Sequence, residues 1–473
     1  MSCWNRRSRR TLAALATAGL LVGPVSAQAA FAADTPSPSV SASQSADDSG
    51  FPQLSSDVAA ELDRAIEGAM TRTKAPGAIV GVWSPGKGEY VKTFGVSDKA
   101  PGTTTGPSGK PMEADFYTRI GSLTKTFTVT ALLELVDQKK IGLDDPISKY
   151  IPGVPNGDKI SIRHLADMRS GLYSYTFDPG FQKAFFGNPD RPFTPQQLLD
   201  YAFKHPVQFQ PGERFDYCNT NLILLGLVVE KLTGRPLQDV IRDDVAKPAG
   251  MDHTIFPTDA AFPDPHAQGY TNQTESGKVE DSADWNPSWG WAAGAMISNL
   301  DDLHTWAKVM ATGVLPDGKR LISEATQKQR LETPPTSIPG AGYGLGIFDV
   351  QGWIGHNGSL PGYETISMYL PEADATVVVM LNTDILVDGV YEPSTLFGEA
   401  ITQVLTPDHV YNLPAGNNPS TSASPSTSAS EESSASPSAS ESESQSSSPS
   451  ASSSESAGDS ESPATGSSTP GLR

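Results

Sequence analysis

Strand-like segments stand at both ends of the folded part of this chain, and this arrangement constrains the fold more than any other feature. The strand-like segments are residues 78–83, 90–94, 343–350, 365–370 and 375–381. The first two are split by Pro85-Gly-Lys-Gly88, which predicts a hairpin. Residues 58–72 and 393–404 have helical patterns, and the middle, from Ser122 to about Leu315, is mostly helical pattern and loops. We therefore expect an α+β fold: one antiparallel sheet built from both ends, terminal helices on it, and a helical insertion subdomain beside it.

The run Gly121-Ser122-Leu-Thr-Lys125 precedes an apolar helical stretch, residues 126–136. On a helix, Ser122 and Lys125 would lie on one face, one turn apart. A serine hydroxyl becomes a good nucleophile only when a nearby base takes its proton. Lys125 can be that base if its apolar neighbours desolvate it and lower its pKa. Ser-x-x-Lys is common by chance, and an N-cap serine beside a solvated lysine is the simpler reading of the motif alone.

Two further motifs strengthen the catalytic interpretation. Tyr217-Cys-Asn219 lies just before a second apolar helical run, residues 222–232, and His356-Asn-Gly358 lies between two strand-like segments. In order, Ser-x-x-Lys, Tyr-x-Asn and His-x-Gly resemble the serine β-lactamase and penicillin-binding superfamily. Within it, the chain is similar to the branch of class C β-lactamases and secreted D-Ala-D-Ala carboxypeptidases. The resemblance runs from about residue 51 to 410.

This resemblance implies a β-lactamase/transpeptidase-like fold and an acyl-enzyme mechanism. Ser122 would be the nucleophile, and Lys125 would share proton transfer with Tyr217, the general acid and base. Asn219 would bind the carbonyl group of the acyl donor, and His356 would tune the proton relay and bind the substrate. Each of these residues also has an ordinary structural reading, such as a core tyrosine or a turn asparagine.

The remaining candidates surround these motifs. Gly358 would let the substrate backbone approach closely, and the backbone N–H groups of Ser122 and Ser359 would form the oxyanion hole implied by the resemblance. Trp289 is one of three tryptophans within seven residues, and it is expected either to line the cleft or to lie in the core. Phe181 is a weaker candidate for the facing wall. Cys218 is expected to be a buried small residue rather than a reactive thiol.

The chain departs from the carboxypeptidase pattern where a substrate carboxylate would bind. Asn357 stands at the first of two hydroxyl positions around Gly358, whereas Ser359 keeps the second. The expected arginine is replaced by Phe348, and Asp349 adds negative charge beside it. A carboxylate prefers a cationic fork, so weak recognition of a free C-terminal carboxylate is expected.

The two ends of the chain predict processing and spacer segments. Residues 1–32 have four arginines and then a short apolar stretch, which is typical of an export signal, either plain secretory or twin-arginine. Residues 33–50 form a Pro/Ser-rich linker, 51–412 the hydrolase domain, and 413–473 a Ser/Ala/Pro/Glu-rich tail. The composition of the tail cannot build a packed core and predicts disorder.

The net charge limits the kinds of partner that the chain can bind, and the cysteine content limits the disulfides that it can form. The net charge is -20, and removing the four signal arginines gives -20 - 4 = -24. This balance argues against nucleic acid or anionic membranes as partners. Of two cysteines, Cys3 leaves with the signal, so the mature chain has one thiol and no internal disulfide. No metal or cofactor motif is recognised, so none is expected, and no membrane span is expected after signal removal.

Together these features predict a secreted or envelope-located serine hydrolase. The favoured activity is that of a D-Ala-D-Ala carboxypeptidase acting on peptidoglycan stem peptides, with β-lactams as covalent ligands. The alternatives are an esterase or a β-lactamase of the same superfamily, or a wall-associated binding protein without turnover. Because fold does not determine substrate, the residues alone leave this choice open.

Overall fold

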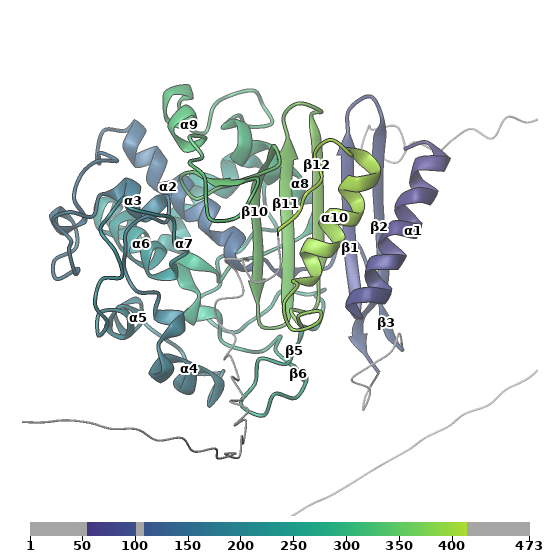
Figure 1. Cartoon of the computed structure of the whole chain (residues 1–473), viewed down its shortest axis with the longest axis horizontal. Helices are drawn as coiled ribbons and strands as arrows, with labels where there is room; N and C mark the ends of the chain where they lie inside the picture. Colours follow the sequence, from purple (N-terminus) through teal and green to yellow (C-terminus); the bar gives the residue numbers. More distant parts are fainter. Residues whose placement is uncertain (1–53, 101–107, 414–473) are drawn as a thin grey trace, which may run out of the picture. The chain divides into compact units, whose positions relative to one another are not determined.

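The computed structural model describes residues 54–100 and 108–413 (Figure 1). The expected export signal, the linker and nearly all of the tail lie outside the described residues. The predicted α+β class is confirmed: helices flank one large sheet with the strand order β3-β2-β1-β12-β11-β10-β9-β8. Every neighbouring pair in this sheet is antiparallel.

Both ends of the described chain contribute to this sheet, as the sequence predicts. Its strands are β1 (Gly77–Ser84), β2 (Gly88–Lys99), β3 (Gly109–Pro111), β8 (Ala341–Tyr343), β9 (Phe348–Val350), β10 (Trp353–Leu360), β11 (Tyr363–Leu370) and β12 (Ala375–Leu381). The ends are joined where β1 pairs with β12, with Ala78 opposite Leu381. Strands β1, β11 and β12 are buried along their whole length, because helices cover both faces of the sheet.

Alternation along β11 shows which helix covers which face. The Ser367 hydroxyl donates a hydrogen bond to the carbonyl of Leu303 in α8 (Leu300–Thr312). The next residue toward the start of the strand, Ile366, faces α10 (Pro393–Leu405), where its side chain lies near Gly398. Successive side chains of a strand point to opposite faces, so α8 and α10 cover opposite faces. Helix α1 (Ser56–Thr73) packs beside α10 (Figure 1).

The helical part follows the start of the sheet in sequence. Its helices are α2 (Thr124–Asp137), α3 (Ile162–Ala166), α4 (Pro179–Phe186), α5 (Pro195–Ala202), α6 (Asn219–Thr233) and α7 (Leu237–Val240), and α9 (Glu324–Arg330) follows later. Two minor sheets pair β4 (Thr118–Arg119) with β7 (Ile297–Ser298) and β5 (Tyr270–Thr271) with β6 (Glu280–Asp281). Helices α2 and α6 contact each other and are buried almost all round. This contact brings the first two motifs together.

Two local expectations need correction. His356-Asn-Gly358 does not lie between strands but inside strand β10, where two glycines had weakened the strand pattern. The segment 343–350 is not one strand, because the chain leaves β8 after Tyr343 and enters β9 at Phe348. Gly346 stands between them with a φ of 66°, a left-handed conformation that a strand does not accommodate.

Candidate active site

The candidate nucleophile lies on a tight turn rather than within a regular helix. Ser122 belongs to the 3-10 turn η1 (Gly121–Leu123), and α2 begins at Thr124. Gly121 has a φ of 51°, and a Cβ atom there would lie 2.8 Å from the backbone nitrogen of Ser359. A glycine is therefore required for both the conformation and the close approach of β10.

Lys125 is completely buried beside this serine. Its Nζ atom lies 2.9 Å from the Ser122 Oγ atom and donates a hydrogen bond of 2.7 Å to the Ala293 carbonyl. Burial holds the pKa of Lys125 well below that of an exposed lysine, although Cys218 acts in the opposite direction. A neutral amine at this distance can accept the hydroxyl proton. The structure thus confirms the desolvation that the apolar neighbours of Lys125 predicted.

Tyr217 lies next to this pair, just before α6. The Lys125 Nζ atom lies 4.8 Å from the centre of the Tyr217 ring. Burial raises the pKa of Tyr217, and the neighbouring Ser122 hydroxyl opposes that rise. The phenol is therefore protonated at neutral pH, and its hydroxyl accepts or donates no hydrogen bond of normal geometry with the described residues. It remains available to exchange a proton during catalysis.

His356 lies behind the reacting groups rather than in the pocket. It is fully buried, and its Nε2 atom lies 3.1 Å from the Tyr343 hydroxyl. Burial and the nearby Lys125 lower its pKa to about 3, against the effect of the Asn357 carbonyl. His356 is thus neutral, and its ring centre lies 6.2 Å from that of Tyr217. Its ring lies beside that of Tyr217, and it is not among the residues that line the pocket, so its role in the proton relay and in substrate binding stays a prediction.

Strand β10 approaches the nucleophile closely at Gly358. A Cβ atom at Gly358 would lie 2.0 Å from the Ile120 carbonyl oxygen and 3.0 Å from the Ser122 backbone nitrogen. The backbones that carry the two expected oxyanion-hole donors, Ser122 and Ser359, therefore lie side by side. Gly358 itself makes this close approach of the two backbones possible because it has no side chain.

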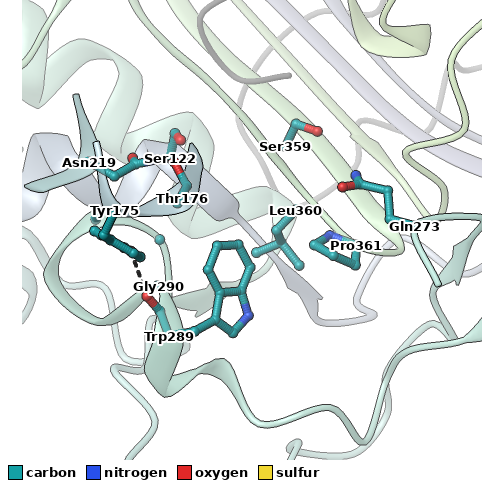
Figure 2. A pocket seen from close by; sticks show the side chains of 12 residues that line it. Ser122, Tyr175, Thr176, Asn219, Gln273, Trp289, Gly290, Ser359, Leu360 and Pro361 are labelled. Atoms are coloured by element: carbon teal, nitrogen blue, oxygen red, sulfur yellow. Dashed lines mark hydrogen bonds between the residues drawn. The ribbon is translucent and has the colours of Figure 1, made fainter. Parts of the chain in front are cut away.

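The pocket in front of Ser122 has an empty volume of about 450 Å³, open solvent included (Figure 2). Asn219, Ser359 and Trp289 line it, so of the two positions left open for Trp289 the structure has the one in the pocket wall. Sequence reasoning missed further lining residues: Tyr175, Thr176, Gln273, Gly290, Ala293, Gly294, Leu360 and Pro361. Only Tyr175 and Thr176 had a signal, since they fall in the aromatic segment that had suggested Phe181.

Phe181 is not itself a wall of the pocket. It is 2% exposed and packs edge-to-face on Tyr175, with 5.1 Å between the ring centres. The Tyr175 hydroxyl donates a hydrogen bond of 2.6 Å to the Trp289 carbonyl (Figure 2). Phe181 therefore holds the wall residue Tyr175 from behind.

The pocket offers no cation to a substrate carboxylate. None of the 12 described residues that line it has a charged side chain. Asn357 is buried on the α10 side of the sheet, where its amide donates a hydrogen bond of 3.1 Å to Glu392. Phe348, at the expected arginine position, is 1% exposed and packs against His356.

Within residues 54–100 and 108–413, no three His, Cys, Asp or Glu side chains gather as a metal-ligand set. In the same ranges, no helix combines the length and the apolar character that a bilayer span requires.

Comparisons with known proteins agree with this geometry. Residues 62–395 match the family model described as Beta-lactamase. A D-stereospecific amidohydrolase from a Streptomyces species is 31% identical, with a TM-score of 0.63, and the match covers 74% of this chain and 99% of that one. The D-amino acid amidase of Ochrobactrum anthropi, solved with D-phenylalanine, is 26% identical over 74% of this chain and 98% of that one, with a TM-score of 0.64.

A curated D-aminopeptidase of Brucella anthropi is 27% identical over 65% of this chain. The match spans only 56% of that relative's length, little more than half. The family match and the structural likeness together cover the described sheet, the helical part and all three motifs. The chain belongs to the beta-lactamase family and is a serine hydrolase of that superfamily.

Proposed function

We propose that this protein cleaves amide or ester bonds of small amino-acid-derived substrates through an acyl-enzyme on Ser122. The observation that carries the proposal is the buried Lys125 amine, 2.9 Å from the Ser122 hydroxyl. A lysine kept neutral by burial is a base, whereas a solvated lysine would be protonated at neutral pH.

The reaction has an acylation stage and a deacylation stage. Lys125 takes the Ser122 proton as Oγ attacks the carbonyl carbon, and the tetrahedral oxyanion forms beside the Ser122 and Ser359 backbones. Tyr217 gives its proton to the leaving nitrogen or oxygen, the C–N or C–O bond breaks, and Lys125 returns a proton to Tyr217. Water then attacks the acyl-enzyme by the same relay in reverse, which releases the acid and restores Ser122.

Three relatives support the amidase side of this proposal: the names of the amidohydrolase, the amidase and the aminopeptidase all refer to D-configured substrates. A dedicated D-Ala-D-Ala carboxypeptidase is a weaker candidate, because the described pocket lining has no cation for a free carboxylate. Removal of a charged hydrogen-bond partner typically costs about 1.5–3 kcal/mol of binding. We therefore place the substrate among D-aminoacyl amides and esters whose leaving group carries no carboxylate.

We also propose that the enzyme acts outside the cytoplasm. This rests on the sequence of residues 1–32 alone, which lie outside the described part. Cell fractionation, followed by sequencing of the mature N-terminus, tests it. Recovery of the intact chain in the cytoplasm alone would contradict export.

The first catalytic test is intact-mass analysis after incubation with a fluorescent penicillin. The full mass of the penicillin should be added, peptide mapping should place it on Ser122, and Ser122→Ala should abolish the adduct. Label on Cys218 or on another serine would refute the mechanism.

A second test compares kcat/KM for a small p-nitrophenyl ester, a D-Ala-D-Ala peptide and the C-terminal amide of that peptide. The ester should react at least as fast as the peptide, and the acid and amide should differ little. A preference for the acid above about a hundredfold, equivalent to about 2.7 kcal/mol, would restore a dedicated carboxypeptidase.

A further inference from the structure

Gln273 faces Ser122 across the pocket. Figure 2 shows its amide pointing toward the middle of the pocket, on the side opposite Ser122. Its Nε2 atom donates a hydrogen bond of 2.5 Å to the Oδ2 atom of Asp384. Its Oε1 atom is buried and accepts no hydrogen bond from the described residues. A buried acceptor without a partner is costly, and the pocket is the place from which a donor can come.

Asp384 fixes which end of the Gln273 amide faces the pocket. This carboxylate is 2% exposed, and its Oδ1 atom accepts a hydrogen bond of 2.8 Å from the backbone N–H of Gly362. Its Oδ2 atom also accepts the Thr271 hydroxyl at 3.1 Å. Burial raises the pKa of Asp384 to about 6 against these hydrogen bonds, so it is ionised at pH 7.5. An ionised carboxylate only accepts, so it must face the NH2 end of the amide and leave Oε1 toward the pocket.

The position of Gln273 also indicates which part of a substrate it meets. Tyr217, which would protonate the leaving atom, is packed behind Ser122 against Lys125 and His356. Gln273 instead lies on the loop after β5, near the residues that follow Ser359 along the pocket. The part of the substrate on this side is the acyl group that stays on Ser122 after the leaving group departs.

We propose that Gln273 is a specificity residue, whose Oε1 atom accepts a hydrogen bond from an N–H group in the acyl part of the substrate, with Asp384 as its positioning residue. This inference rests on the proposed function and narrows it to acyl groups that carry an amine or amide N–H. Aminoacyl and N-acylaminoacyl groups fit, whereas simple fatty acyl groups lack the donor.

The test uses two substrates that differ by a single replacement of N–H by CH2: p-nitrophenyl N-acetylglycinate and p-nitrophenyl 4-oxopentanoate. Their leaving group is the same, so only the acyl part varies. The measured quantity is the ratio of their kcat/KM values, compared between variants. This comparison cancels the intrinsic difference in reactivity between the two esters.

Gln273→Met keeps the length of the side chain and removes the acceptor. We expect the ratio of kcat/KM for the N-acetylglycinate to kcat/KM for the 4-oxopentanoate to fall about tenfold, as for the loss of one buried hydrogen bond. The kcat/KM for the 4-oxopentanoate itself should change little. Gln403→Met, the same replacement at an exposed site on α10, should leave the ratio unchanged. Asp384→Asn should reduce the preference partly, because a neutral amide accepts and donates and no longer selects one orientation of Gln273.

The outcomes separate the two proposals. An unchanged ratio in Gln273→Met, or an equal loss for both esters, overturns the specificity role; the second result would show a structural role instead. If Gln273→Met does not fold, a wild-type ratio in Asp384→Asn also overturns it. If the wild-type enzyme turns over neither ester and acquires no adduct on Ser122, the proposed function fails and this inference with it.

Discussion

Replacing Gly358 by alanine should disable the active site although it adds only one methyl group. That methyl group would lie 2.0 Å from the Ile120 carbonyl oxygen and 3.0 Å from the Ser122 backbone nitrogen. Ordinary contact begins at 3.4 Å, so β10 and the nucleophile turn must separate by about 3.4 - 2.0 = 1.4 Å. Both sides are backbone, so no side-chain rotation relieves the clash.

The expected loss follows from this displacement. A misplacement of about 1 Å in reacting groups can cost on the order of a hundredfold in rate. Loss of one oxyanion donor typically costs about 2.7–4 kcal/mol, equivalent to about 10²–10³-fold in kcat. Overpacking also costs roughly 1–3 kcal/mol of stability. We therefore expect kcat/KM to fall at least a hundredfold, whereas the melting temperature falls by only a few degrees.

The assay is hydrolysis of a p-nitrophenyl ester, with circular dichroism to follow folding and melting. Gly68→Ala is the matched control, because no atom lies within 4 Å of a Cβ placed there and the residue is exposed in α1. The control should keep full activity and gain about 0.5–1 kcal/mol of stability, as expected for glycine replaced by alanine within a helix. If Gly358→Ala keeps kcat/KM within about threefold of wild type, the close approach of β10 is not needed for catalysis.

Three further predictions concern single groups. Burial lowers the pKa of Lys125, so its neutral, basic form persists as the pH falls, and kcat/KM should be flat through neutral pH and decline only at acid pH. Activity that appears only above about pH 10, near the ordinary pKa of lysine, would contradict a desolvated base. Cys218 is 3% exposed and burial raises its pKa to about 12, so it should react with a thiol reagent only after unfolding; rapid labelling of the native enzyme, located by peptide mapping, would refute this. Trp289→Ala should lower kcat/KM about tenfold more for esters with large apolar acyl groups than for the acetyl ester. An equal effect on both kinds of ester would show that Trp289 does not contact the acyl group.

Elements with a strong local pattern could be predicted from the sequence. The amphipathic segment 58–72 became α1 (Ser56–Thr73), and the hairpin around Pro85 became β1 and β2. Strand β10 was missed because Gly355 and Gly358 interrupt its apolar pattern. Those glycines are required by packing from other parts of the chain, such as Ile120 against Gly358, and no local rule reveals that requirement.

The same distinction applies to the candidate site. Ser122, Lys125, Tyr217 and Asn219 could be found because they stand in spaced motifs, and the structure brings them together. The complete burial of His356 and the side of the sheet on which Asn357 lies could not be predicted, because both depend on which face of β10 packs against which neighbour. Gln273 carries no motif at all; only the pairing of β5 beside Thr383, next to Asp384, brings its loop to the pocket.

The pairing of β1 with β12 has a consequence for how the enzyme is made. Ala78 and Leu381 are partners although 381 - 78 = 303 residues separate them. Closing such a long loop carries an entropic cost that grows with its length, and distant pairings of this kind slow folding. During synthesis, Ser122 and Lys125 emerge long before Gly358 and the strands that complete the sheet. Activity therefore requires the nearly complete domain. A chain interrupted before β10 contains the nucleophile and its base but lacks the strand that must lie against them.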